Sequence, residues 1–319
     1  MTEQNSQDNP GTLQTKTSQD GHWFRYVLET MRPHQWVKNL FVLAPLFFSQ
    51  AFWHTEPLAR GVAAAVLFSL MAGTVYLIND IADRERDRQH PTKRHRPIAS
   101  GKLSVRRAKL AAWVAGFAAA VGSIALSPYF AAVVLTYLVM NLAYSKVLKS
   151  YAFVDIGIIA AGFVLRVVAG ALAAGVFLSE WLLVCTFLLA CFLALGKRRH
   201  EVATSEECQM KKTRKGWENY RAEQLDVGLF FVGGLTVAGY TIYALTASLP
   251  DQPLRTRYTP FSSPLLPVTI PLVMFGLARF FQLSRLKTPQ SPTERMLRDW
   301  WVLAIGVVWV GALLALGIE

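Results

Sequence analysis

Three aspartates that close an apolar run are the residues of this chain best suited to chemistry. The run ends in "YLINDIADRERDRQHP", where Asp80, Asp83 and Asp87 are three and four residues apart. A helix that continues through this stretch places them and Tyr76 within about 60° of one another around its axis, with Asn79 beside them. Carboxylate oxygens are the ligands that Mg²⁺ prefers. The aspartates and Asn79 therefore predict a magnesium site, shared with substrate phosphates.

Cationic side chains follow the aspartates directly, in "HPTKRHRPIASGK". Lys93, Arg94 and Arg96 come after a proline turn, so they are predicted to fold back over bound phosphate and neutralise a diphosphate. The tendency of membrane proteins to keep positive residues on the cytoplasmic side explains these three residues equally well, and both interpretations stay open.

The elements that must position these residues are membrane helices. The chain has 319 residues, of which 53% are hydrophobic and 17% charged, and its mean hydropathy is +0.30. This composition argues against an ordinary soluble domain and indicates a polytopic membrane protein. Apolar segments of about the length that crosses a bilayer predict an all-α bundle of nine transmembrane helices. The segments are residues 38–54, 58–80, 106–127, 129–147, 152–177, 180–197, 225–249, 262–284 and 300–317.

Charge predicts how the chain is oriented in the membrane. Residues 1–22 are polar and read as a disordered cytosolic tail, and residues 23–319 read as one catalytic membrane domain. Most of the 33 lysines and arginines fall in the tail and in connections on the same side. This predicts a plasma-membrane protein with a cytoplasmic N-terminus. The topology also accounts for most of the net charge of +12, so no nucleic-acid partner is needed to explain it.

The aspartate pattern N-D-x-x-D-x-x-x-D resembles the first aspartate-rich motif of the UbiA superfamily of intramembrane prenyltransferases. Four other segments resemble its decaprenyl-phosphate phosphoribosyltransferase branch: "RPHQWVKNLFVLAPL", "HPTKRHRPIASG", "YSKVLKSYAFVDI" and "GKRRHE". The resemblance implies helices around a central cavity open to the cytosol. It also implies Mg²⁺-dependent transfer of 5-phosphoribose from 5-phosphoribosyl 1-diphosphate to a polyprenyl phosphate, a step toward cell-envelope glycans.

The chain departs from the superfamily at its second motif. Aromatic prenyltransferases carry a second aspartate-rich motif there, whereas this chain has Lys197, Arg198 and Arg199, with Glu201 the only early carboxylate. One acidic and one basic cluster suit two anionic substrates of which one needs a metal. The substitution favours an acceptor that is itself a phosphate, with Lys197 and Arg198 as candidates to orient phosphates.

Other polar residues are predicted to bind substrate. Asp155 and Arg166 are eleven residues apart, which puts both on one side of a helix. An arginine inside a span normally faces a cavity or a partner, so Arg166 is a binding residue or one half of a buried pair. Lys149 could contact a phosphate or reach toward the interface, and Asp155 could bind a ribose hydroxyl or a second metal. The remaining candidates for substrate binding are Lys38, Asn39, Tyr76, Tyr144 and Glu201.

Two other classes of protein remain as alternatives. An aromatic prenyltransferase that uses an isoprenoid diphosphate explains the aspartates equally well but leaves "GKRRHE" unexplained. A transporter or lipid flippase fits the number of spans and Arg166, but aspartates at one mouth of the bundle are not typical of it. Besides the two substrates, the expected partners are membrane lipids, and a homo-oligomer is left open.

Overall fold

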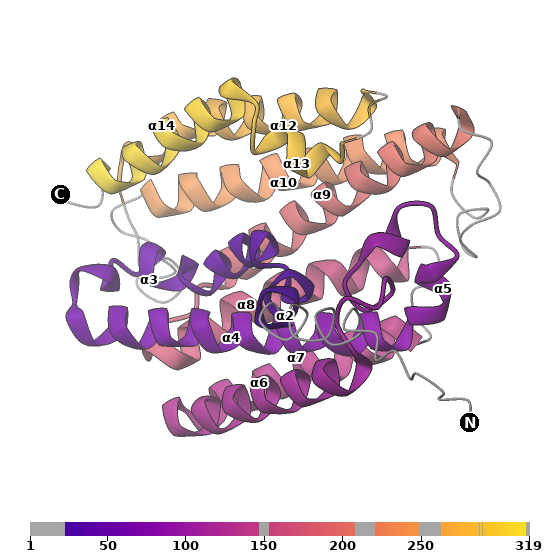
Figure 1. The fold of residues 1–319 in the computed structure, drawn as a ribbon. Coiled ribbons are helices and arrows are strands. Elements are labelled where there is room, and N and C mark those ends of the chain that lie inside the picture. Colours follow the sequence, from indigo (N-terminus) through magenta and orange to yellow (C-terminus); the bar gives the residue numbers. More distant parts are fainter. Residues whose placement is uncertain are drawn as a thin grey trace, which may run out of the picture. The chain divides into compact units, whose positions relative to one another are not determined.

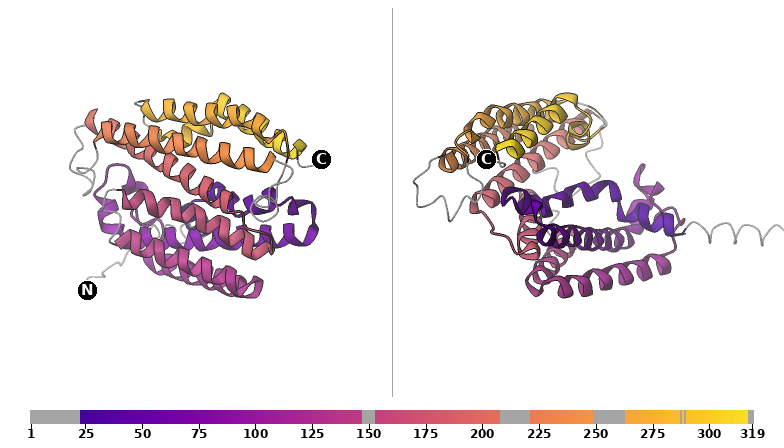
Figure 2. Two further views of the ribbon diagram at one scale, coloured as in Figure 1. Left: turned by 180° about the vertical axis from the view of Figure 1, so that it is seen from behind. Right: turned by 90° about the vertical axis from the view of Figure 1, so that its left-hand side faces the viewer.

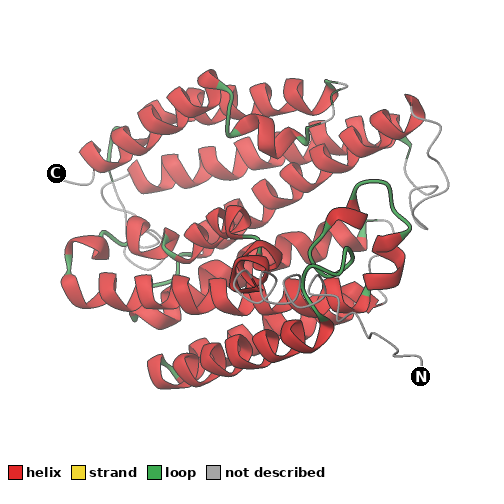
Figure 3. Ribbon diagram, in the orientation of Figure 1, coloured by secondary structure: helices red, strands yellow, loops and turns green. Residues whose placement is uncertain are grey.

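The structure is a computed structural model, and it describes residues 23–146, 153–207, 221–248, 263–286, 288 and 290–316. Within these residues every regular element is a helix and none is a strand (Figure 3). Seven of the described helices are long and apolar enough to cross a membrane, and an eighth apolar helix is shorter. The predicted all-α, multi-pass membrane fold is therefore confirmed. The predicted tail, residues 1–22, lies outside the described residues.

Eight of the predicted spans correspond to helices. The long ones are α4 (Thr55–Ala82), α6 (Val105–Leu126), α7 (Pro128–Lys146), α8 (Val154–Ala174), α9 (Glu180–Glu207), α10 (Ala222–Ser248) and α12 (Ile270–Arg285), which a 3₁₀ turn, η6 (Leu266–Thr269), precedes. The shorter apolar helix is α14 (Trp300–Leu316), and α13 (Pro292–Met296) stands before it.

The first predicted span, residues 38–54, is not one continuous helix. It consists of the end of a 3₁₀ helix, η1 (Pro33–Val42), a short helix, α3 (Ala44–Phe48), and a 3₁₀ turn, η2 (Ala51–Trp53). Pro45 lacks the N–H group that a helix running through this point would need. Gln50 has a φ of 57°, a left-handed conformation that ends α3. Among the described residues, the nine predicted spans therefore correspond to seven long helices, one short one and this divided segment.

The chain divides into two compact units. Unit 1 lies within residues 1–38 and 66–123, and unit 2 within residues 39–65 and 124–319. Unit 1 contains α2 (Trp23–Met31), the second part of α4, the short helices α5 (Arg84–Arg88) and η3 (Lys93–His95), and most of α6. Its core is a cluster of buried side chains that includes Val27, Met31, Leu77, Ile98 and Leu103. This core holds the end of α4, where Asp80 lies and after which Asp83 and Asp87 follow.

Unit 2 is built around α9. This helix packs against α8, α10 and α12, and α8 packs in turn against α7 and α3 (Figure 1). The same pairing of α9 with α10 is visible from behind (Figure 2). Phe192 of α9 packs with Leu225 and Leu229 of α10 and Phe280 of α12 in one buried cluster. The packing fixes the end of α9 that carries the predicted basic motif.

Gly170 of α8 is a point of very close backbone approach. A Cβ atom at this position would lie 1.7 Å from the carbonyl oxygen of Val42 in η1. No side chain fits at that distance, and the neighbouring atom belongs to the backbone, which cannot rotate away. The glycine therefore allows the divided first segment to lie directly on α8.

Replacing Gly170 by alanine should destabilise unit 2 by about 3 kcal/mol or more, because the backbone of η1 must move to admit the methyl group. Thermal unfolding of the detergent-solubilised protein measures the effect. Gly157→Ala, in the same helix, is the matched control, since a Cβ atom there meets nothing within 4 Å. Equal unfolding temperatures for the two variants would contradict the close approach.

Candidate functional site

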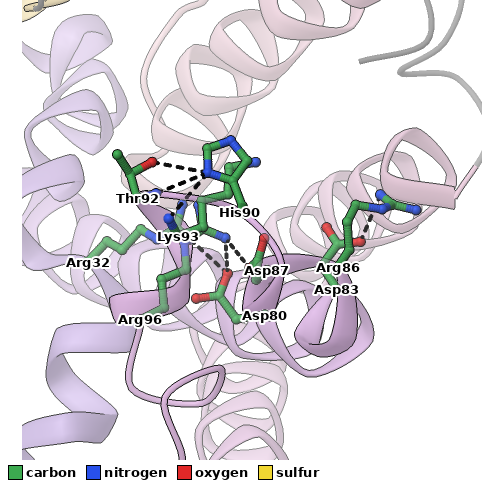
Figure 4. Close-up of polar contacts among 9 residues, drawn as sticks. All are labelled: Arg32, Asp80, Asp83, Arg86, Asp87, His90, Thr92, Lys93 and Arg96. Carbon is green, nitrogen blue, oxygen red and sulfur yellow. Dashed lines mark hydrogen bonds and ion pairs between the residues drawn. The ribbon is translucent and has the colours of Figure 1, made fainter. Parts of the chain in front are cut away.

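The aspartate cluster of unit 1 centres on two buried carboxylates and one arginine. Asp80 lies near the end of α4 and Asp87 lies in α5, with only 4% and 2% of their surfaces exposed. Nη1 of Arg96 donates hydrogen bonds to both, at 2.7 Å from Oδ2 of Asp87 and 3.2 Å from Oδ1 of Asp80 (Figure 4). Arg96 therefore bridges the two carboxylates, and the predicted fold-back of the "HPTKRHRP" segment is observed for this residue.

Arg32 is a second arginine in this cluster, where it contacts Asp80, and sequence reasoning missed it. Its Nη2 atom donates to Oδ1 of Asp80 at 2.7 Å, and its guanidinium lies 4.8 Å from the centre of the Tyr76 ring. Its partner is 48 residues away in the chain. The only signal for it in the sequence was its position at the start of "RPHQWVKN".

Asp83 has a different partner. Nη1 of Arg86 donates to its Oδ1 atom at 3.2 Å, and the arginine of this pair is largely exposed. Figure 4 shows Asp83 and Arg86 set apart from the Asp80 and Asp87 carboxylates. The backbone departs from α-helical angles at Asp83, with φ −90° and ψ 3°. The three aspartates therefore do not all meet at one point, because the helix is interrupted at Asp83, between Asp80 in α4 and Asp87 in α5.

The chemistry of these donor atoms fits a magnesium ion. Asp80, Asp83, Asp87 and Asn79 offer only hard oxygen ligands from their carboxylates and carbonyl, and Mg²⁺ prefers such ligands. Across the described residues, no three His, Cys, Asp or Glu side chains already form a group that could hold a metal. The observed counter-ions of Asp80 and Asp87 are guanidinium groups, so a metal ion that binds both must take the place of Arg96.

His90 shapes the turn that leads to Arg96. Its Nδ1 atom accepts hydrogen bonds from the backbone N–H groups of Thr92 and Lys93, at 3.3 and 3.4 Å. Burial lowers the pKa of His90, and the positive charge of Lys93 lowers it further, so the ring is neutral and can accept these bonds near pH 7. Lys93 and Arg94 themselves are exposed at the surface of the turn.

Two residues of unit 1, Lys38 and Tyr76, share one hydrogen-bond partner. The Nζ atom of Lys38 donates to Oε1 of Gln35 at 2.8 Å, and the Tyr76 hydroxyl donates to the same oxygen at 3.5 Å. The structure thus connects two predicted binding residues through a glutamine that sequence reasoning did not single out.

In unit 2, the basic motif at the end of α9 is held by carboxylates. Nε of Arg198 donates to Oδ2 of Asp155 at 2.5 Å, and Nη1 donates to Oε2 of Glu201. Arg198 and Asp155 are each only 4% exposed. Arg198 is therefore already paired with two carboxylates, whereas its neighbour Lys197 is exposed. Tyr144 lies within electrostatic range of Arg198.

A second ion-pair group joins three helices of unit 2. Arg199 of α9 donates to Oδ1 and Oδ2 of Asp226 in α10, at 3.0 and 3.3 Å, and Nη2 of Arg285 in α12 lies 3.4 Å from Oδ2 of Asp226. No pattern in the sequence pairs these residues, because they are 27 and 59 positions apart. The group fixes the ends of α9, α10 and α12 next to Arg198.

Arg166 is buried in the middle of α8 and has polar partners there. Its Nε atom donates to Oδ1 of Asn39 at 2.8 Å, Nη1 to the carbonyl of Gly162 at 2.7 Å, and Nη2 to the hydroxyl of Tyr137 at 3.1 Å. Of the two interpretations of this intramembrane arginine, a buried group of polar contacts is the one that the structure displays. Asn39, predicted as a substrate ligand, is itself buried against Arg166. Lys149 lies outside the described residues.

Comparison with known proteins decides the family. Residues 40–303 match the UbiA prenyltransferase family. The chain belongs to this family. It is 33% identical over 300 residues to the decaprenyl-phosphate phosphoribosyltransferase of Mycobacterium tuberculosis, covering 91% of this chain and 95% of that one. It is 32% identical over 311 residues to the protein of the same name from Corynebacterium glutamicum, covering 95% and 89%.

A solved UbiA homologue from Archaeoglobus fulgidus bound to GPP and Mg²⁺ has the same fold. It superposes with a TM-score of 0.65 at 19% identity, over 92% of this chain and 98% of that one. As a member of the UbiA family, this chain is a transferase enzyme of the membrane. The ion in the homologue supports the use of a divalent metal in the family.

Proposed function

We propose that this UbiA-family chain transfers 5-phosphoribose from 5-phosphoribosyl 1-diphosphate to a polyprenyl phosphate. The products are diphosphate and polyprenylphosphoryl 5-phosphoribose. The lipid-linked product supplies cell-envelope glycan synthesis. The observation that carries the proposal is the similarity, over nine-tenths of the chain, to relatives with this named activity. Charge-rich clusters in both units support it, because both substrates are phosphorylated.

On the donor side, the aspartate cluster of unit 1 is the proposed binding site for the diphosphate. Asp80, Asp83, Asp87 and Asn79 would hold Mg²⁺, which would neutralise the charge that builds on the diphosphate as it leaves. Arg32 and Arg96 are within hydrogen-bond distance of Asp80. Their guanidinium groups can bind phosphate oxygens and hold the leaving group in one orientation.

In the reaction itself, an oxygen of the lipid phosphate attacks C1 of the ribose, and the bond from C1 to the diphosphate breaks. A phosphate monoester is largely ionised near pH 7, so the protein does not have to supply a strong base. The role of its cations is to position the phosphates and stabilise charge. Exposed Lys197 is suited to this role, together with Lys93 and Arg94.

The sequence suggests that Arg198 orients phosphates, but its contacts support a different role. Because Asp155 and Glu201 already neutralise it, we assign it to holding these two carboxylates in place. Asp155 can then accept a hydrogen bond from a ribose hydroxyl. Arg166 stabilises the middle of α8 through Asn39 and Tyr137.

The proposed location is the plasma membrane, with the N-terminus and the active site facing the cytoplasm, where phosphoribosyl diphosphate would be available. The support is the concentration of lysines and arginines in connections on one side of the predicted spans. The polyprenyl phosphate would enter from the surrounding lipid.

The test is an assay with purified protein, a polyprenyl phosphate and phosphoribosyl diphosphate labelled in its ribose. Label should enter the organic phase when Mg²⁺ is present and not when EDTA removes it. The alternative, an aromatic prenyltransferase, predicts no lipid label here and prenylation of an aromatic ring when an isoprenoid diphosphate is supplied. That second result would reject the proposed donor and acceptor.

A further inference from the structure

The aspartate cluster of unit 1 is already neutral without a metal. Asp80 and Asp87 carry two negative charges, and Arg32 and Arg96 carry two positive charges within ion-pair distance of them. The carboxylates have only 5% and 3% of their side-chain surface exposed. A buried carboxylate needs a counter-charge and hydrogen bonds in place of its water. Arginine supplies here the positive charge that a metal ion would otherwise supply.

Arg96 competes most directly with a metal ion. A single nitrogen, Nη1, lies 2.7 Å from Asp87 and 3.2 Å from Asp80 (Figure 4). A divalent ion that binds both aspartates needs oxygen lone pairs of the same two carboxylates. The bridge made by Arg96 must therefore open before the ion can bind both.

The charge balance determines which ligand can open the bridge. A divalent ion alone would leave the buried cluster with two excess positive charges, which is unfavourable in a site with little water. A diphosphate group carries about three negative charges near pH 7. It brings the cluster back toward neutrality, and its oxygens can accept the hydrogen bonds of the displaced guanidinium.

We propose that Arg96 determines the ligand specificity of this site: it excludes free divalent ions from Asp80 and Asp87 and admits the ion only together with a diphosphate. The inference rests on the proposed function in one respect: it takes from it that a metal diphosphate binds at these aspartates. Arg32 also competes with a free divalent ion, but only at Asp80. Its backbone has a φ of 55°, a left-handed conformation that is costly for a residue other than glycine.

Arg96→Gln tests the inference with Mn²⁺ alone as the probe and no diphosphate present. Electron paramagnetic resonance of the free ion gives the Kd for the detergent-solubilised full chain. The variant should bind Mn²⁺ about tenfold more tightly than the wild type, because nothing bridges the two carboxylates. On a desalting column, the wild type should retain Mn²⁺ only with inorganic diphosphate, and the variant should retain it without.

Arg86→Gln is the matched control. It removes one positive charge from the same segment, but Arg86 is 70% exposed in its pair with Asp83, so the Kd should change by less than about twofold. Unchanged or weaker Mn²⁺ binding by Arg96→Gln, or an equal change in the control, would overturn the proposal. If Arg96→Gln does not fold, Arg32→Gln replaces it. This variant should show a smaller tightening, and no tightening would also overturn the proposal.

The ion-binding measurement is independent of the transfer reaction. If no phosphoribose is transferred but Mn²⁺ binding changes as expected, the proposed function fails and the role of Arg96 stands. If transfer occurs and both proteins bind Mn²⁺ equally, the role of Arg96 fails alone.

Discussion

Asp87→Asn should lower the rate of phosphoribosyl transfer at least about 100-fold at a fixed Mg²⁺ concentration, because it removes one of the charged ligands proposed for the leaving group's metal. Asp80→Asn should have an equal effect. Both replacements keep the shape of the side chain, and Arg96 keeps one aspartate partner in each variant. The protein should therefore stay folded. Asp83→Asn should lower the rate less, because Asp83 lies apart with exposed Arg86.

The measurement is the initial rate of transfer as a function of Mg²⁺ concentration, with thermal unfolding as a check on the fold. The variants at Asp80 and Asp87 should need more Mg²⁺ than the wild type to reach half their own maximum. Glu85→Gln is the matched control, because Glu85 lies in the same helix, α5, and is paired with exposed Arg88. A loss of rate in this control as large as in Asp87→Asn would contradict the assignment of the metal ligands.

Arg198→Met should lower the stability of unit 2 by about 3–5 kcal/mol, because it removes the guanidinium that pairs with the carboxylates of buried Asp155 and partly exposed Glu201. The unfolding temperature should fall by roughly 10 °C. Lys197→Met is the matched control at the adjacent, exposed position, and its unfolding temperature should be close to that of the wild type.

A second substitution separates ion pairing from simple loss of packing. Asp155→Asn in the Arg198→Met background removes one of the two charges that Arg198 balances in the wild type, so the double variant should be more stable than Arg198→Met alone. Calorimetry or circular dichroism in detergent gives the comparison. If Arg198→Met unfolds at the wild-type temperature but has lost activity, Arg198 is a phosphate ligand, as its sequence position had suggested, and the anchoring role is wrong.

The membrane spans were the part of the fold that the sequence could predict. Their length follows from the thickness of the hydrocarbon layer, so apolar runs alone identified most of the long helices within a few residues. The exceptions are α9, which continues to Glu207 beyond the predicted end at residue 197, and α12, which begins at Ile270 and not at residue 262. The first span could not be predicted in the same way. Its composition is apolar, but Pro45 and the left-handed Gln50 divide it, and its backbone contact with Gly170 depends on packing between distant segments.

The candidate site was predictable where it depends on local spacing. Helical periodicity predicted Asp80 and Asp87 on one side, seven residues apart, and the structure joins them through Arg96 although the helix is interrupted at Asp83. Periodicity could not reveal Arg32, which reaches Asp80 from 48 residues away. It also could not show that Arg198 is neutralised by Asp155, 43 residues away. A sequence displays charges but not their partners, so the basic motif looked more available to phosphates than it is.

The central claim is that the 5-phosphoribosyl group moves to the lipid while the diphosphate leaves. Two preparations of phosphoribosyl diphosphate test it most directly, one labelled at the 5-phosphate and one at the terminal phosphate of the diphosphate. The account predicts that the first label appears in the lipid phase and the second appears in water as inorganic diphosphate. Terminal-phosphate label in the lipid, or no lipid label from either preparation, would contradict it.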